Sequence, residues 1–469
     1  MLSSSRRSVR ALGAGALAVA VAAALAACGG DEESGDDAAA GIKVWIQEDL
    51  PDRVAATQKI VDSFTAASKV KVELVPVAED QFNQLLTSSA AAGDLPDVIG
   101  GVSLPQVRTM SANELLDTDA TADVMKKLGE DTFSESALTL TRDGDTQLAI
   151  PSESWTQLLV YRKDLFEKAG LQPPDSYDAM LAAAQKLDTP KLAGFVGANI
   201  AGDAFTAQTF EHLALGNDCQ LVDDAGKVTI DSPQCVESLQ FYGDLVSKYS
   251  VSGGQDVDTT RASYFAGQAA MTIWSTFILD EMAGLRKDAL PSCAECKSAP
   301  AFLAKNSGIV TSIQGPDGTR PSSFGEIVSF ATTTSAPKDS AAKFIEYMMS
   351  DAYTQWLGIA PEGKVPTRQG TKPGDTSYLD AWQKLKAGVD TKAPLSDFYA
   401  PDVLAAVQKA PETFNRWGLP QGQGALVGAM QGPLPVPKAL AGLINGSGDP
   451  AAAAQSAQKA VEDLQKSTN

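Results

Sequence analysis

The side chains that most often carry enzyme chemistry are scarce in this sequence. His212 is the single histidine among 469 residues. A metal centre built from several histidines is therefore excluded, and only one imidazole could activate a serine or cysteine nucleophile. This count disfavours most enzyme mechanisms and favours a protein that binds its ligand without transforming it.

A run of polar side chains, Gln47-Glu48-Asp49, comes directly after the first strand-like segment, residues 42–46. In α/β folds, ligands bind at the carboxyl ends of strands, where this run would lie. Carboxylates and amides form hydrogen bonds with hydroxyl groups, and aromatic rings stack on the C–H faces of sugars. The run is a candidate for binding a hydroxyl-rich ligand, and the alternative is a solvated loop.

Four cysteines lie in the middle of the chain, at positions 219, 235, 293 and 296. An even set suits disulfides, and three pairings are possible. We expect Cys219–Cys235 and Cys293–Cys296, because each closes a short loop. The alternative for Cys293-x-x-Cys296 is a zinc or redox site, but no second CxxC motif or histidine pair accompanies it, and it lies in a loop-like stretch. We expect neither a metal nor a cofactor.

Residues 1–27 have the layout of a secretion signal. Arg6, Arg7 and Arg10 precede an apolar run over 11–24, which is shorter than the ~20 residues needed to span a bilayer. Leu25-Ala26-Ala27-Cys28 resembles the lipobox of bacterial lipoproteins. The resemblance implies cleavage before Cys28 and acylation of its thiol, with the protein held at the extracellular face of the bacterial cytoplasmic membrane.

The alternative is an ordinary signal peptide with a chance cysteine. Residues 5–10 also look like a twin-arginine export signal, although Val9 departs from the usual aromatic, so the export route stays open. Residues 28–41 comprise the lipidated cysteine and a flexible acidic linker. Cleavage would remove three arginines and no acids, leaving 35 basic against 58 acidic residues and a charge of −23.

The whole chain carries 38 Lys and Arg against 58 Asp and Glu, a formal charge of −20. A surface this acidic repels phosphates, so nucleic acid is not an expected partner. Hydrophobic residues make up 44 % of the sequence, which supplies a sizeable core and excludes wholesale disorder. At ~150 residues per domain, the length suggests two or three compact units.

The elements that would position the candidate residues alternate between strand-like and helical patterns. After the strand at 42–46, apolar residues recur at helical spacing over 53–67 and alternate over 70–74. A helical pattern over 81–92 and a short strand at 97–99 continue this order. The alternation predicts an α/β fold with a parallel sheet covered by helices on both faces.

A second series of elements follows Pro151. We expect strands at 157–161 and 194–198 and helices at 163–169, 176–187, 236–249 and 454–464. Two α/β lobes are the natural packing, because one core seldom grows past ~300 residues.

Five segments carry a more specific signal. They are 91–98 (AAGDLPDV), 161–171 (YRKDLFEKAGL), 265–273 (FAGQAAMTI), 341–347 (AAKFIEY) and 363–367 (GKVPT). In this order they resemble the extracellular solute-binding proteins of ABC importers, in the family (family 1) that includes maltose-binding protein. Each segment alone is a weak signal, and Arg162 stands where the family usually has asparagine. Together they cover nearly the whole chain after the linker.

The resemblance implies a two-lobe periplasmic-binding-protein-like fold (type II), with a hinge that the chain crosses more than once. Lobe 1 would comprise residues 42–150 and 298–345, and lobe 2 residues 151–297 and 346–469. Ligand would sit in the cleft between the lobes and favour the closed arrangement through contacts to both. The closed protein, expected to be a monomer, would deliver its ligand to the permease subunits in the membrane.

For the ligand site, the resemblance adds residues on both sides of the hinge. Gly101 and Ser103 follow the strand at 97–99, where the family often places a contact, although glycine there indicates room instead. Trp155 lies just beyond the expected hinge, in a position that the family uses for ligand. Phe277 matches the family's stacking aromatic, although the usual Gly-Pro-Trp is absent, and Trp274 is an adjacent candidate.

Ser323 and Glu326 belong to a glycine-containing turn that the family directs toward the cleft, and Glu326 is a candidate hydroxyl acceptor. Three further tryptophans, at 356, 382 and 417, are expected in the core or at the rim.

These residues predict a lipid-anchored protein that binds a sugar of the oligosaccharide class. We expect it to perform no catalysis. The alternative is a lipid-anchored glycoside hydrolase, which also wants acids and aromatics in a cleft, with two carboxylates roughly 5–10 Å apart. The sequence contains no recognisable acid/base signature for that reaction. A purely structural surface lipoprotein would not account for the ordered motifs.

Overall fold

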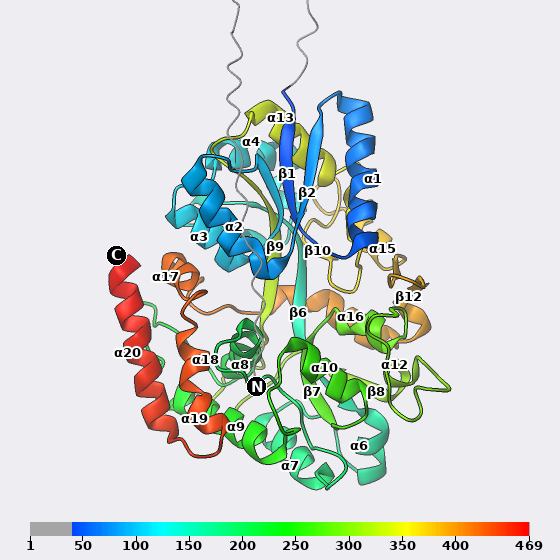
Figure 1. Cartoon of the computed structure of the whole chain (residues 1–469), viewed down its shortest axis with the longest axis vertical. Coiled ribbons are helices and arrows are strands. Elements are labelled where there is room, and N and C mark those ends of the chain that lie inside the picture. Colours follow the sequence, from blue (N-terminus) through cyan, green and yellow to red (C-terminus); the bar gives the residue numbers. More distant parts are fainter. Residues whose placement is uncertain (1–39, 469) are drawn as a thin grey trace, which may run out of the picture. The chain divides into compact units, whose positions relative to one another are not determined.

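The structure, a computed structural model, describes residues 40–468. Its central feature is an eight-stranded sheet in which six strands follow the order β10-β6-β9-β3-β1-β2, while β7 and β8 also pair with β6 (Figure 1). The strands are β1 (Ile42–Gln47), β2 (Val72–Val77), β3 (Val98–Val102), β6 (Ile150–Arg162), β7 (Met271–Ser275), β8 (Ser307–Val310), β9 (Gly325–Thr332) and β10 (Val365–Pro366).

The sheet is mixed, so the expectation of a parallel sheet is only partly correct. β1 pairs in parallel with β2 and β3, through the crossover helices α1 (Pro51–Ser68) and α2 (Glu79–Ala92). β9 pairs antiparallel with β3 and β6, and β7, β8 and β10 pair antiparallel with β6. The local strand-helix alternation reveals the crossover units, but it cannot reveal a strand that enters from a distant part of the chain.

β6 changes its partners in the middle of its length. Residues 150–156 pair with β9, and residues 157–162 pair with β7 and β8. At the change, the amide of Gln157 donates to Phe324 O at 3.0 Å, and the amide of Thr276 donates to Thr156 O at 3.0 Å. β6 therefore carries the chain from one part of the sheet into the other.

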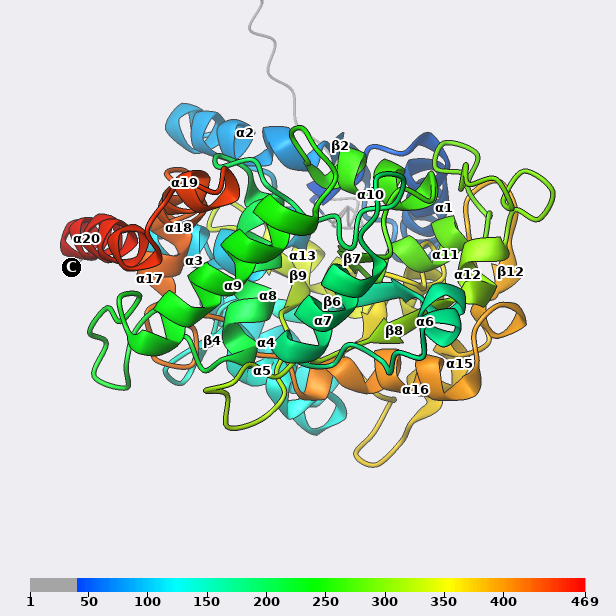
Figure 2. The same ribbon diagram turned by 90° about the horizontal axis from the view of Figure 1, so that it is seen from below.

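The chain passes this point again after β6. β8 pairs with the second half of β6, β9 pairs with the first half, and β10 joins the first half at residues 153–154. Near the C-terminus, α18 (Pro435–Ala439), α19 (Ala441–Ile444) and α20 (Pro450–Thr468) then pack beside α8 (Ala204–Gly216) and α9 (Pro233–Tyr249) (Figure 2). These repeated passages agree with the expected multiple crossing of a hinge.

Most of the expected helices are confirmed. α6 (Lys163–Ala169) ends at Gly170, whose φ is 66°, and α7 (Tyr177–Leu187) begins where the Ser176 hydroxyl accepts a hydrogen bond from the Ala179 amide. The expected strand at 194–198 is wrong. That segment makes only isolated bridges, between Val196 and Thr272 of β7 on one side and between Phe195 and Ser250, just after α9, on the other.

The remaining elements are shorter or lie around the sheet. They are α3 (Leu104–Ala112), α4 (Thr118–Leu128), η1 (Glu130–Thr132), α5 (Glu135–Thr141), β4 (Arg142–Asp143), β5 (Thr146–Gln147), α10 (Val257–Phe265), α11 (Ile278–Met282), α12 (Phe302–Asn306), α13 (Lys338–Met348), α14 (Tyr353–Leu357), α15 (Ser377–Trp382), β11 (Lys386–Ala387), β12 (Ala393–Pro394), η2 (Leu395–Asp397), α16 (Pro401–Lys409), η3 (Ala410–Glu412), α17 (Gly424–Ala429), α18 (Pro435–Ala439), α19 (Ala441–Ile444) and α20 (Pro450–Thr468).

The buried apolar residues form separate clusters on the two faces of β6. Leu158 and Val160 belong to one cluster, which also holds residues of β1, α1 and α13. Leu159 and Tyr161 belong to another, built with α7, α8, α9 and α20. Because successive side chains of a strand point to opposite faces, β6 contributes residues to both clusters.

Both expected disulfides, Cys219–Cys235 and Cys293–Cys296, are present and buried. Cys28, the expected lipidation site, and the signal peptide lie outside the described residues. Within residues 40–468, no helix has the length and apolar character needed to cross a membrane.

Candidate functional site

The carboxyl end of β1 brings together the first group of predicted residues. The Gln47 side-chain amide donates to Gln106 Oε1 at 2.7 Å, and the Gln106 amide donates back at 3.3 Å. Gln106 also accepts a hydrogen bond from the Ser103 amide at 2.9 Å, in a capping box that starts α3. Gly101 has a φ of 91°, and a Cβ there would lie 3.1 Å from Gln47 Cβ. Glycine is therefore required where these side chains meet.

Glu48 and Asp49 follow Gln47 but have different surroundings. Glu48 Oε1 accepts hydrogen bonds from the amides of Asp49 and Leu50, at 3.1 and 3.0 Å. Its other oxygen lies 3.7 Å from a guanidinium nitrogen of Arg53. Glu48 therefore organises the start of α1, whereas the Asp49 side chain is exposed.

Three other predicted residues meet where β6 changes its partners. Trp155 lies opposite Glu326 in the β6–β9 ladder and is half-buried, with its ring centroid 5.8 Å from that of Phe324. Ser323 is buried beside Phe324, and its hydroxyl has no hydrogen-bond partner within the described residues. Trp155, Ser323 and Glu326 thus converge although about 170 residues separate them in sequence.

The Glu326 carboxylate is fully engaged by protein groups. One oxygen accepts a hydrogen bond from the Leu104 amide at 2.7 Å, at the start of α3. The other accepts one from Arg416 at 2.6 Å. Glu326 therefore connects the group at the end of β1 to the C-terminal part of the chain.

Arg416 and Glu211 complete this network, and sequence reasoning missed both. Arg416 Nε lies 3.4 Å from Glu211 Oε1, which also accepts a hydrogen bond from the Trp417 amide at 2.8 Å. The Arg416 guanidinium lies 4.3 Å from the ring centroid of Phe324. Because Phe324 contacts Trp155, Arg416 supports that indole through one intervening ring.

The charges of this network are buried, and one cation faces two acids. Burial raises the pKa of Glu211 and of Glu326, and the charge of Arg416 opposes the rise in both. Burial alone would lower the pKa of Arg416, but the two carboxylates outweigh it and raise that pKa. The single cation is therefore shared between two acids.

His212 has a structural place in the same region. Its Nδ1 accepts a hydrogen bond from the Phe324 amide at 3.1 Å, and burial lowers its pKa to about 3. The imidazole is therefore neutral at physiological pH, and its Nε2 has no partner among the described residues. This environment holds the loop at 323–325 and does not poise the histidine as a general base.

A second group of predicted residues surrounds Phe277, just before α11. The Phe277 ring covers Gly363, where an added Cβ would lie 2.0 Å from the ring. The Arg53 guanidinium lies 5.7 Å from the ring centroid and pairs with Glu362 at 3.0 Å. Phe277 is half-buried, and it meets α1 and the loop before β10 together.

Trp274 is nearly fully buried. Its indole N–H donates to Val257 O at 3.0 Å, and its ring packs near Phe205 and under the guanidinium of Arg261, at 6.3 and 5.5 Å. Trp274 is therefore a packed core residue, and its polar atom is already satisfied.

The two groups adjoin at the end of β1, because Gln47 belongs to the first and Glu48 to the second. Arg416, Glu211 and Glu362 could not be found from local pattern. The signal that they share is burial of a charge with a partner far away in the chain, which a single sequence does not display.

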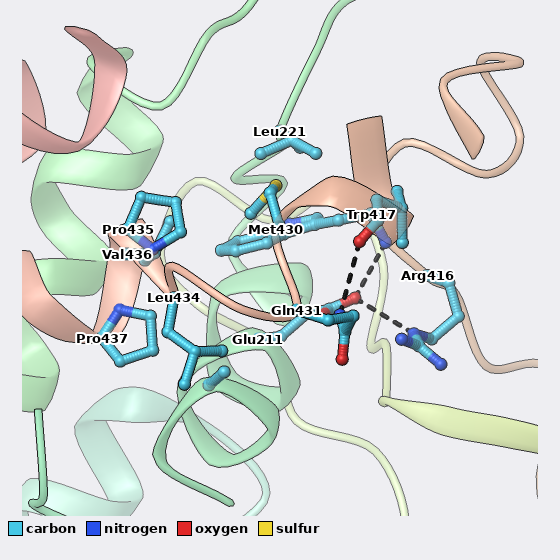
Figure 3. A pocket seen from close by; sticks show the side chains of 12 residues that line it. Glu211, Leu221, Arg416, Trp417, Met430, Gln431, Leu434, Pro435, Val436 and Pro437 are labelled. Atoms are coloured by element: carbon cyan, nitrogen blue, oxygen red, sulfur yellow. Dashed lines mark hydrogen bonds and ion pairs between the residues drawn. The ribbon is translucent and has the colours of Figure 1, made fainter. Parts of the chain in front are cut away.

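A small cavity lies beyond the Glu211–Arg416 pair (Figure 3). Its volume is about 50 Å³, far below the ~300 Å³ at the lower end of ligand pockets. Its walls are mainly apolar, with Trp417, Met430 and Leu434 among them. This cavity has space for a few waters and no space for a sugar.

A larger hollow of about 520 Å³ lies between α4 and α13. Its charged lining residues are Asp123, Lys126, Lys127, Lys338 and Asp339. It contains neither an aromatic ring nor any of the predicted site residues, so it does not have the chemistry of a sugar site. Among residues 40–468, no group of three or more His, Cys, Asp or Glu side chains could hold a metal ion.

Solved structures with the same fold include several binding proteins. The GacH receptor of Streptomyces glaucescens, solved unliganded and with acarbose, has a TM-score of 0.68 and 20 % identity, over 91 % of this chain and 99 % of that one. The maltose-bound MalE3 of T. maritima has a TM-score of 0.67 and 19 % identity, over 91 % and 100 %. These likenesses confirm the expected two-lobe periplasmic-binding-protein fold.

Sequence comparison points the same way. The chain is 28 % identical over 326 residues to the putative ABC transporter periplasmic-binding protein YcjN of Escherichia coli, covering 68 % of this chain and 71 % of that protein. The family described as bacterial extracellular solute-binding protein matches residues 47–355. This chain is therefore a member of the bacterial extracellular solute-binding protein family.

Proposed function

We propose that this protein is the lipid-anchored solute-binding component of an ABC importer. Its proposed ligand is an oligosaccharide, bound between its two lobes. The observation that carries the proposal is the meeting of polar and aromatic side chains at the end of β1. Gln47 ends β1 and Glu48 follows it, Trp155 lies in the middle of β6, and Phe277 lies just after β7. Polar groups beside half-buried rings are the features by which proteins bind sugars.

The proposed lobes are residues 42–150 with 298–345, and 151–297 with 346–469. The change of strand partners at Thr156–Gln157 supplies a place for the connection to bend. Ligand contacts to Phe277 on one side of this bend, and to Gln47 and Glu48 on the other, with Trp155 beside the bend itself, would favour the closed arrangement.

The named relatives support this assignment. YcjN is called an ABC transporter periplasmic-binding protein, and the two solved proteins bind acarbose and maltose. The proposed anchor is Cys28, acylated after removal of residues 1–27, which would hold the protein at the extracellular face of the cytoplasmic membrane beside its permease. We propose that the protein acts as a monomer and without a cofactor.

A thermal-shift screen over mono- and oligosaccharides tests the proposal. A ligand at 100 times its dissociation constant stabilises a protein by ~2.7 kcal/mol, which is readily seen as a rise in Tm. We expect an oligosaccharide to raise the Tm and to be recovered intact. No shift from any carbohydrate would overturn the sugar assignment, and release of hydrolysis products would favour the glycoside hydrolase.

Two substitutions connect the screen to the site. Trp155→Ala and Phe277→Ala should each reduce the affinity for the ligand by at least tenfold, because each removes a stacking surface. Tyr347→Ala is the matched control, because Tyr347 is also a half-buried aromatic residue but packs on Phe64 of α1. Equal losses in all three variants would place the ligand elsewhere.

A further inference from the structure

Three carboxyl groups near Phe277 are completely buried. Asp280 and Glu281 lie in α11, Glu362 lies in the loop before β10, and each residue has an exposed fraction of 0 %. Both oxygens of Asp280 and one oxygen of each glutamate have no hydrogen-bond partner within the described residues. Buried carboxylates without partners are unfavourable, so this concentration requires an explanation.

The nearby arginines are committed to the two glutamates. Arg53 donates to Glu362 Oε1 at 3.0 Å. Arg261 and Arg286 both approach Glu281 Oε1, at 3.0 and 3.1 Å. Asp280 therefore has no hydrogen bond from a cation, although Arg53 and Arg286 are close enough for their charges to act on it.

The other groups around this site do not neutralise Asp280. The Tyr399 hydroxyl donates to Leu279 O at 2.7 Å and is thus occupied. The charge of Lys392 acts on Glu362. Beyond the three arginines, further acids pair outward with them, namely Glu48 with Arg53, Asp258 with Arg261, and Asp288 with Arg286.

Asp280 and Glu362 come from opposite sides of the partner change in β6. Asp280 follows β7, which pairs with the second half of β6. Glu362 precedes β10, which pairs with the first half. Phe277 and Gly363 pack together beside them, so the acids lie at a contact between the two parts of the sheet.

We propose that the buried cluster of Asp280, Glu281 and Glu362 keeps a proton on Asp280 at neutral pH and that this proton helps to hold α11 against the loop at 360–363. Both Asp280 oxygens are buried without a hydrogen-bond partner among the described residues, so the protonated form is the less costly one there. Protonation also removes one of two negative charges that would otherwise repel each other in a buried site, where water does not screen them. In support, burial first, and then the charges of Glu362 and Glu281, raise the pKa of Asp280 well above its ordinary value.

The proton makes stability depend on pH in a defined direction. In the unfolded chain Asp280 ionises near its ordinary pKa, whereas the folded protein retains the proton to higher pH. The stabilisation is therefore complete below the unfolded pKa and is lost as pH rises through the folded pKa. Each proton held only by the folded state changes the unfolding equilibrium constant by about tenfold per pH unit.

Unfolding by urea across pH 5 to pH 9 tests the proposal, since the native protein should lose stability over this range. Asp280→Asn should reduce the pH dependence of the unfolding free energy by the equivalent of one proton. Asp258→Asn, which removes an exposed acid of the same cluster, should retain the wild-type dependence. Burial raises the pKa of Glu281 to about 7. Its proton adds to the pH dependence of unfolding in the wild type and in both variants.

Infrared difference spectra supply an independent readout. The carbonyl band of a protonated carboxylic acid should be present at neutral pH, reduced by the share of one carboxyl in Asp280→Asn and retained in full in Asp258→Asn. An unchanged pH slope together with an unchanged band in Asp280→Asn would overturn the proposal. If Asp280→Asn does not fold, Glu362→Gln serves instead, and it should also shift or reduce the band and reduce the slope.

The inference also bears on solute uptake, and that part rests on the proposed function. If closure of the lobes forms the contact between α11 and the loop, solute affinity should fall as pH rises, and Asp280→Asn should flatten this fall. Failure to bind any carbohydrate would refute the proposed function but would leave the pH dependence of unfolding intact. The two proposals therefore fail on different measurements.

Discussion

Replacing Arg416 by alanine should destabilise the protein strongly. Among residues 40–468, Arg416 is the one cation that contacts Glu326, at 2.6 Å, and Glu211, at 3.4 Å, and all three residues are at most 9 % exposed. Removing one partner of a buried ion pair leaves an uncompensated charge and typically costs about 3–5 kcal/mol. We expect a loss in this range, since two buried acids would lose their cation at once.

Urea unfolding followed by tryptophan fluorescence measures the loss. Arg142→Ala is the matched control, because Arg142 forms an equally short ion pair with Glu130, at 2.7 Å, but both side chains are substantially exposed. Exposed pairs contribute about 0–1 kcal/mol, so the control should change stability little. The difference between the two arginines isolates the effect of burial.

The pH dependence of the loss provides a second check. Without Arg416, the pKa values of Glu211 and Glu326 should rise further, because burial already raises both and Arg416 opposes the rise. The variant should therefore recover part of its stability as pH falls from 8 to 5 and the acids take up protons. A loss no larger than that of Arg142→Ala, with no recovery at low pH, would refute the idea that Arg416 neutralises these acids.

Two further predictions concern packing and covalent structure. Gly363→Ala should cost about 1–3 kcal/mol and weaken ligand binding, because its Cβ would lie 2.0 Å from the Phe277 ring, whereas Gly432→Ala, with open space around it, should have little effect in the same urea and binding assays. Replacing both Cys219 and Cys235 by serine opens a loop of 16 residues and should cost about 3 kcal/mol, seen as a lower Tm; an unchanged Tm would show that the bond contributes no stability.

Elements with a clear apolar period could be predicted from the sequence. The helix at Lys163–Ala169 and the strand from Ile42 were found almost to the residue, because their patterns are local. β6 was predicted only over 157–161, yet it begins at Ile150. Its first half contains Ser152 and Glu153, which read as loop residues but are buried.

The buried polar residues of β6 are stabilised by partners that the local sequence cannot show. The Ser152 hydroxyl donates to Val328 O at 3.0 Å in β9. Glu153 pairs with Lys364 and accepts a hydrogen bond from the Trp356 indole at 2.8 Å. These partners lie about 175 to 211 residues away in the chain. Hydrophobic periodicity therefore fails here because tertiary hydrogen bonds permit polar residues in a buried strand.

The candidate site was accessible to sequence reasoning only in part. Polar residues at the end of β1 follow from the general position of ligands in α/β folds. Trp155, Phe277 and Glu326 required a family resemblance, because nothing in their own segments indicates that they meet. Arg416 was missed because its two acids lie 205 and 90 residues away.

The distribution of these charges has a physical consequence for the connection between the lobes. Around the middle of β6 the structure places directional ion pairs, Arg416 with Glu326, Lys364 with Glu153, and Arg53 with Glu362. Apolar contacts would tolerate many relative orientations of the two parts, because they depend on buried area and not on direction. Charged hydrogen bonds weaken steeply with distance and angle, so a rotation about β6 must break some of them. We therefore expect these buried pairs to limit the number of stable orientations, and a ligand to select among the few that remain.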